Sequence, residues 1–399
     1  MRGRTTAWPP TGAAKIRAIP LADVLAKYQV LTSMKKTNAL SLALLIGISA
    51  ASAAPVDVSP VAGNEPGPDR SVPLPDLPDR AYSMPNADAR VKKPGRSEIG
   101  LHLNSSTFVN QEIQDKGVTM TRFERETVSL DYRRGFAING RPVEFGVQVN
   151  AFKDAVGFQN STISAVEKFF HEANPVRSDA SVPHGETVIM KGQVRRSYDG
   201  NGSGLNDVLF SVKTGLYKAP ELDVALRGVL NVALGAREAS RGNFAGTGIG
   251  AAYRLGSNWT LNGDVRATVP LEKKDTLGLP LGSVAYGWTL GIVRALSSKT
   301  SAVVEISDER SNYKTGFRSY DNGHLGLKLG VNHATQLFGR PALIQFGVRE
   351  NGQSSPKVGL INDRGADAEF FGRVAFSVLA SSGPVRIVSS CVVFPLEGD

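Results

Sequence analysis

The stretch ELDVALRGVLNVALG, residues 221–235, alternates between apolar and mixed positions along its length. Side chains of an extended chain point alternately to opposite faces, so this pattern predicts a β-strand with one apolar face. The apolar face carries Leu222, Val224, Leu226, Leu230, Val232 and Leu234. The other face carries Asp223, Ala225, Arg227, Val229, Asn231 and Ala233. One face of this strand is therefore suited to hydrocarbon, and the other carries both charge signs.

The same alternation recurs from residue 97 onward. Candidate strands lie at residues 97–109, 122–137, 141–152, 185–198, 205–217, 221–235, 247–255, 259–269, 283–296, 300–310, 323–333, 341–351 and 368–378. Strands of soluble proteins average about five or six residues, whereas transmembrane strands need about 9–11, so the candidate lengths favour a membrane barrel. Short connections alternate with longer polar ones, as turns and external loops do in outer-membrane barrels. The sequence predicts an all-β, antiparallel up-and-down transmembrane β-barrel of about 12–14 strands.

Charged residues gather on the mixed faces of these strands. In hydrocarbon each would cost several kcal/mol, so they are expected to line the lumen. The expected lumen-lining residues are Asp131, Glu144, Lys213, Asp223, Arg227, Asp264, Arg266, Glu305, Lys328, Arg349, Glu369 and Arg373. Their mixed signs leave two interpretations open. They line a water-filled path and tune ion passage, or they pair across a filled lumen and hold the wall together; the interleaving of opposite signs favours the second.

A secretory signal peptide is predicted at residues 34–53. Met34 is followed by two lysines, an apolar run over residues 39–48 and the small residues 51–53, which fit a cleavage site. The apolar run is shorter than the roughly 20 residues that a permanent membrane helix needs. Residues 1–33 are expected to be a mis-called, unstructured start, and the rest of the chain to be exported to the outer membrane.

The charge balance excludes nucleic acid as a partner. The formal net charge is +9, but residues 1–54 contribute +6 of it, which leaves only +3 on the remainder. Cys391 is the single cysteine, so no internal disulfide and no zinc pattern is available. The run G-x-G-x-x-A at residues 246–251 continues as a strand instead of opening a helix, so it does not indicate a dinucleotide. No cofactor and no metal site are expected.

Proline content sets the expected domain boundaries. Nine prolines between residues 55 and 96 predict a Pro-rich periplasmic linker over 54–96, with packing across the domain as the alternative. The barrel is assigned to 97–380 and an atypical C-terminal tail to 381–399. Within that tail, residues 385–394 are a candidate further strand that would make the count even.

One segment, NSTISAVEKFFHEANP at residues 160–175, does not alternate. Its spacing predicts a short helix built on Ile163, Val166, Glu167, Phe169, Phe170 and His171. This helix is a plug in the lumen, a lid on a loop, or a surface helix at the membrane interface. Glu167 and His171 share one helix face, but two ligands do not make a metal site.

Some segments resemble a known group of proteins. GSGLNDVLFSVK, residues 202–213, is similar to the G-x-G-[DN] strand opening of uncharacterised Gram-negative outer-membrane barrel families. ETVSLDYRRGFAI at 126–138, VEFGVQVNAF at 143–152 and FFHEANPVR at 169–177 look like one of these families, whose members are exported proteins of unknown function. The resemblance covers roughly residues 97–378. It implies a barrel fold and an outer-membrane location, but no activity.

The function predicted from the sequence is that of an outer-membrane β-barrel, a channel or transport-type barrel with a charged lumen. Its expected partners are outer-membrane lipid, the barrel-assembly machinery during biogenesis, and a small solute or ion. No nucleophile elbow, P-loop or H-E-x-x-H motif occurs, so an enzyme is not expected. Two alternatives stay open: a soluble periplasmic β-rich ligand-binding protein, and an outer-membrane lipid-modifying enzyme with a serine–histidine pair at the rim.

Overall fold

The computed structural model describes residues 89–155, 184–234, 242–275, 278–310, 312–321, 323–355, 359–361 and 367–379. Nearly all of these residues lie in antiparallel strands. The strands are β1 Arg96–Gln114, β2 Gly117–Ile138, β3 Arg141–Ala155, β4 Gly185–Met190, β5 Gln193–Tyr198, β6 Ser203–Lys218, β7 Leu222–Ala233, β8 Phe244–Leu255, β9 Trp259–Pro270, β10 Ala285–Ala295, β11 Thr300–Arg310, β12 Gly323–Leu337, β13 Arg340–Ser355, β14 Gly359–Ile361 and β15 Asp367–Leu379. A short helix, α5, spans Arg318–Asp321.

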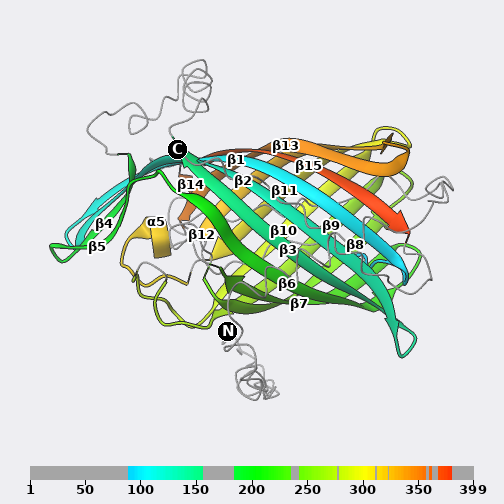
Figure 1. Cartoon of the computed structure of the whole chain (residues 1–399), viewed down its shortest axis with the longest axis horizontal. Helices are drawn as coiled ribbons and strands as arrows, with labels where there is room; N and C mark the ends of the chain where they lie inside the picture. Colours follow the sequence, from blue (N-terminus) through cyan, green and yellow to red (C-terminus); the bar gives the residue numbers. More distant parts are fainter. Residues whose placement is uncertain are drawn as a thin grey trace, which may run out of the picture. The chain divides into compact units, whose positions relative to one another are not determined.

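Twelve of these strands close into a barrel (Figure 1). Each pairs antiparallel with its neighbour in the order β1, β2, β3, β6, β7, β8, β9, β10, β11, β12, β13 and β15. The first and last strands then meet, with Arg96 opposite Leu379 and Ser106 opposite Glu369. Closure leaves no free edge in the wall, which is the condition for a sheet to span hydrocarbon. The predicted all-β barrel is confirmed, and its strand count falls within the predicted 12–14.

The wall carries its apolar residues on the outside. In β7 the side chain of Leu226 is 38% exposed, whereas Asp223 and Ala225 are 6% and 2% exposed. In β10 the apolar side chain is again the exposed one: Leu290 is 55% exposed and Thr289 is buried. Other exposed apolar residues of the wall include Leu101, Leu130, Phe145, Phe210, Ile249, Leu261, Val265, Trp288, Ile306, Leu329 and Phe346. A soluble protein seldom exposes so continuous an apolar surface.

The candidate strand at 185–198 is wrong as a single strand. It is a hairpin of β4 and β5, and β4 pairs with Gly117–Arg122 of β2 beyond the wall. The hairpin projects at the left of Figure 1. Lys191 and Gly192 both adopt positive φ, 52° and 73°, which is the geometry of a two-residue type I′ turn. The alternation on either side of this turn hid it, and the hairpin accounts for the odd thirteenth candidate.

The two ends of the barrel differ. Turns at 139–140, 219–221, 256–258, 296–299 and 338–339 close one end, which we name the short-turn end. Apart from the two-residue turn at 115–116, longer connections lie at the other end, which we name the long-loop end. There β4, the 271–284 loop and the 312–321 loop join inward-facing Leu209 and Val229 in one buried apolar cluster around Tyr320. The described parts of the 271–284 and 312–321 loops therefore pack against the barrel.

Several predicted segments lie outside the described residues. They are residues 1–33, the signal peptide at 34–53, residues 54–88 of the linker, the helix at 160–175 and the tail at 381–399. Among the described residues, no helix has the length and apolar character to cross a membrane.

Candidate functional site: the charged interior

The twelve residues expected to line the lumen occupy the face of the wall opposite the exposed apolar residues. Ten of them are less than 9% exposed, and Arg227 and Asp264 are half-buried. The strand register brings several onto directly opposite positions: Glu144 and Arg227 both face Lys213, Glu305 faces Lys328, and Arg349 faces Glu369. The alternation in the sequence therefore predicts which side chains lie on the inner face of the wall. The pairing register of the strands decides which of them are neighbours.

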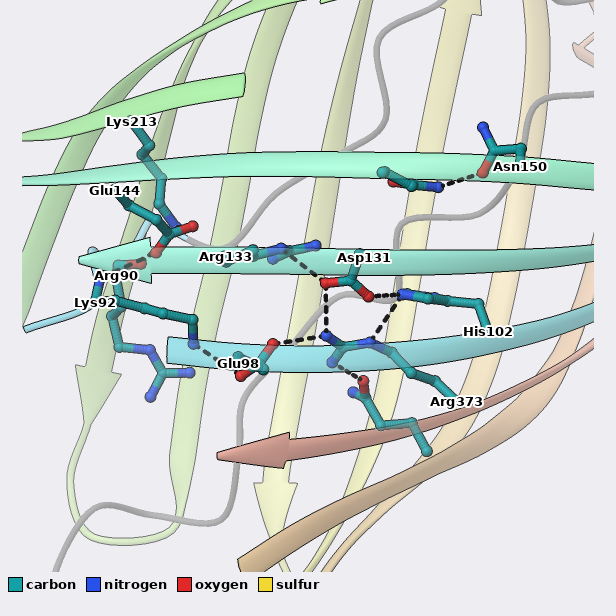
Figure 2. Close-up of polar contacts among 12 residues, drawn as sticks. Arg90, Lys92, Glu98, His102, Asp131, Arg133, Glu144, Asn150, Lys213 and Arg373 are labelled. Carbon is teal, nitrogen blue, oxygen red and sulfur yellow. Dashed lines mark hydrogen bonds and ion pairs between the residues drawn. The ribbon is translucent and has the colours of Figure 1, made fainter. Parts of the chain in front are cut away.

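A cluster around Arg373 lies where the first and last strands meet (Figure 2). The Arg373 guanidinium donates to Glu98 at 2.7 Å and to the Gln345 side-chain oxygen at 3.0 Å. It also lies 3.5 Å from Asp131 of β2 and 3.1 Å from Nε2 of His102. Arg373 thus ties β15 to β1, β2 and β13, which makes it the centre of a polar seam. We name Glu98, His102, Asp131 and Arg373 the seam cluster.

A second group of charges lies beside it on β3 and β6. Lys213 Nζ is 3.3 Å from Glu144, and it also donates to the backbone carbonyl of Arg90 at 2.6 Å. The backbone amide of Lys92 donates to Glu144 at 3.0 Å, and Lys92 Nζ donates to Glu98 at 2.8 Å. Residues just before β1 therefore reach the inner face of the wall.

Further ion pairs continue around the wall. Arg266 of β9 binds Asp264 at 2.7 Å and reaches Glu309 of β11 at 2.5 Å, with Thr289 of β10 accepting a bond at 2.8 Å between them. Lys328 pairs with Glu305 on the adjacent strand. Arg349 lies 3.9 Å from Glu369.

These ion pairs run along the wall, between residues of the same or neighbouring strands. The ion pairs described above join wall residues on the same strand, on adjacent strands, or on strands separated by one other strand. Charges that neutralise one another along the wall do not need a partner on the opposite side of the bore. The register brings opposite signs together at Glu144 and Lys213 and at Glu305 and Lys328. The choice between a water-filled path and a filled lumen stays a prediction.

A row of polar side chains extends from His102 of the seam cluster. His102, Ser129 and Asn150 occupy directly opposite positions on β1, β2 and β3, and all three are buried. His102 Nε2 lies against Asp131, but His102 Nδ1 and Ser129 Oγ each make no hydrogen bond, so they do not bond to each other. The serine–histidine bond that a catalytic triad requires is therefore not formed here. This row could not be predicted from the sequence, since the three residues are far apart in the chain.

An aromatic cage lies nearer the long-loop end. The Arg125 guanidinium binds Asp154 through two bonds of 2.6 Å and lies over the rings of Phe108, Phe123 and Phe152. Tyr198 of the β4–β5 hairpin donates to Asp154 at 2.5 Å. Burial raises the pKa of Tyr198, and its bond to Asp154 raises it further. This cage could not be predicted from the sequence, because Arg125 and Asp154 meet only through the β2–β3 register.

The described residues hold no group of three or more histidine, cysteine, aspartate or glutamate side chains placed to bind a metal. The predicted plug or lid residues, from Ile163 to His171, lie outside the described residues.

Comparison with known proteins gives likenesses of fold only. No family model matches the chain, and no curated protein matches it. An outer membrane channel from Pseudomonas putida F1 is 10% identical, with a TM-score of 0.46 over 72% of this chain and 97% of that one. A Pseudomonas aeruginosa FadL homologue is 6% identical, with a TM-score of 0.35 over 72% and 90%. An anion-selective porin from Comamonas acidovorans is 11% identical, with a TM-score of 0.30 over 71% and 99%. At TM-scores below 0.5, these likenesses carry no argument about the activity of this chain.

Proposed function

We propose that the chain is an outer-membrane channel that passes small polar or charged solutes through a charge-lined barrel. The observation that carries this proposal is the opposition of the two wall faces: apolar side chains point out, and buried charges point in. An apolar exterior suits outer-membrane lipid, in which a charged residue near the midplane would cost about 2–4 kcal/mol. A soluble ligand-binding protein would need the opposite arrangement, with polar residues outside.

The lateral ion pairs support passage over a purely structural interior. Arg266, Lys328 and Arg349 each hold carboxylates of their own or nearby strands, so the wall is neutralised locally. A ring of locally paired charges presents both signs to a passing solute, which is how channel walls tune ion passage. The proposal includes no catalytic step.

Location and assembly belong to the same proposal. It includes insertion through the barrel-assembly machinery, which the closed antiparallel wall supports, and export by the leader predicted at residues 34–53. The predicted membership of an uncharacterised outer-membrane family remains a prediction.

Reconstitution into planar lipid bilayers tests the proposal. Purified protein that migrates as a folded barrel is expected to give stepwise conductance, and liposomes carrying it are expected to swell in isotonic solutions of small uncharged solutes. A folded barrel that gives neither conductance nor swelling contradicts the proposal.

A further inference from the structure

The segment just before β1 lies inside the barrel. Residues 89–95, which we name the N-terminal strap, precede Arg96 at the short-turn end. Ala89 is 4% exposed and packs against Ala225 of β7 and Ala252 of β8, both of which face inward. The strap therefore starts against β7 and β8 and ends at β1.

The strap is held by bonds along most of its length. Lys213 donates to the Arg90 carbonyl, the Lys92 amide donates to Glu144, and Lys92 Nζ donates to Glu98 (Figure 2). Closer to β1, the Gly95 amide donates to the carbonyl of Gly135 at 3.0 Å. These contacts involve β1, β2, β3, β6, β7 and β8, which are six consecutive strands of the twelve in the wall. A segment that touches half of the wall from inside occupies the mouth of the bore.

A glycine on β2 makes room for the strap. Gly135 faces inward, and a Cβ added there would lie 2.5 Å from the Lys92 carbonyl oxygen and closer still to that of Lys93. Both obstacles are backbone, so a side chain at this position and the strap cannot both keep their places. Gly215 on β6 also faces the strap, but a Cβ there would meet only Pro142 and Val91 side-chain atoms, at 3.9 and 4.0 Å. The two glycines form a matched pair, one that excludes a methyl group and one that accepts it.

We propose that the N-terminal strap is the constriction of the conduction path at the short-turn end. The proposal rests on the proposed channel function. The fold alone would leave a ring of inward charges at this end, among them Glu98, Glu144 and Lys213. The strap instead narrows the mouth and binds three of these groups, so both the width of the path and its local charge depend on residues that lie outside the wall.

Conductance of two glycine variants of the full chain tests the proposal. Gly135→Ala is expected to displace the strap and to raise single-channel conductance about twofold or more, because the narrowest section limits flow. Gly215→Ala is expected to match the unaltered chain. Unaltered conductance in a folded Gly135→Ala barrel would overturn the strap as the constriction while leaving the channel function intact. Absence of conductance in all three folded proteins would overturn the channel function itself.

A thiol-labelling experiment tests whether the strap is the constriction even if Gly135→Ala fails to fold. With Cys391→Ser as the background, Lys92→Cys places one thiol on the strap and Ser257→Cys places one on the exposed β8–β9 turn at the same end. A bulky charged thiol reagent is expected to lower the conductance of the Lys92→Cys channel and to leave that of Ser257→Cys unchanged. Modification of Lys92→Cys, shown by mass, without a fall in conductance overturns the proposal.

Discussion

Replacing Arg373 by methionine should destabilise the barrel more than any other single change in the seam cluster. Its side chain is 1% exposed and holds Glu98, Gln345 and His102, with Asp131 at 3.5 Å. Removing one partner of a buried ion pair typically costs about 3–5 kcal/mol, because the remaining charge stays buried. Glu98 keeps Lys92 and Asp131 keeps Arg133, so a loss of about 3 kcal/mol, the low end of that range, is expected.

Arg133 provides the matched control. It also contacts Asp131, at 3.2 Å, but its side chain is 20% exposed. Solvent screens such a pair, so Arg133→Met is expected to cost about 1 kcal/mol or less. The free energy of unfolding would be measured by urea denaturation in detergent micelles, followed by tryptophan fluorescence. Equal losses in the two variants, or a loss below about 1 kcal/mol for Arg373→Met, would refute the reasoning from burial.

A double-mutant cycle isolates the contact itself. Glu98→Gln removes the charge that Arg373 holds at 2.7 Å. Once Arg373 is methionine, Glu98→Gln should relieve an unpaired carboxylate, so the two changes should couple by about 1 kcal/mol or more. Strict additivity would show that the carboxylate gains nothing from Arg373.

Two further predictions concern the path and the hairpin. Arg266→Ala leaves Asp264 and Glu309 without their shared cation, so the reversal potential in a salt gradient should shift toward cation selectivity. Arg227→Ala should shift it in the same direction. Unchanged selectivity in both variants argues against a conducting lumen lined by these arginines. Tyr198→Phe removes the bond to Asp154, so protease should cut the β4–β5 hairpin faster at neutral pH. Since the folded-state pKa of Tyr198 is raised, the stabilisation that its hydroxyl provides is complete below about pH 10 and is lost as the pH rises above that value. Protease should therefore cut the hairpin of the unaltered chain faster at alkaline pH. The phenylalanine variant should show no such increase.

The wall could be predicted from the sequence because side-chain alternation is a local property. Asp223, Ala225 and Arg227 alternate with Val224 and Leu226 in sequence, and they do so in the barrel. The same local pattern led to the wrong prediction of a single strand at 185–198, because alternation continues on both sides of a two-residue turn. Period two shows that a segment is extended, but it does not show whether the segment lies in the wall.

The partners within the interior could not be predicted, because register decides them. The bond between Arg373 and Glu98 joins residues 275 positions apart, and it forms only when the first and last strands pair. The strap is a second case. Proline content over residues 55–96 predicted a linker, with packing across the domain as the alternative, and the described part of that range packs inside the barrel. Its anchors, Gly135 and Lys213, lie far along the chain and carry no local signal.

Gel migration of the outer-membrane fraction shows whether the chain forms a closed barrel in that membrane. Cells expressing the chain from Met34 would be fractionated, and the outer-membrane fraction would be run with and without boiling. A barrel closed by pairing of β1 with β15 resists detergent until it is heated. The protein should therefore appear in this fraction, and the unboiled protein should migrate faster than the boiled protein. Recovery in the soluble periplasm, with the same migration before and after boiling, would contradict it.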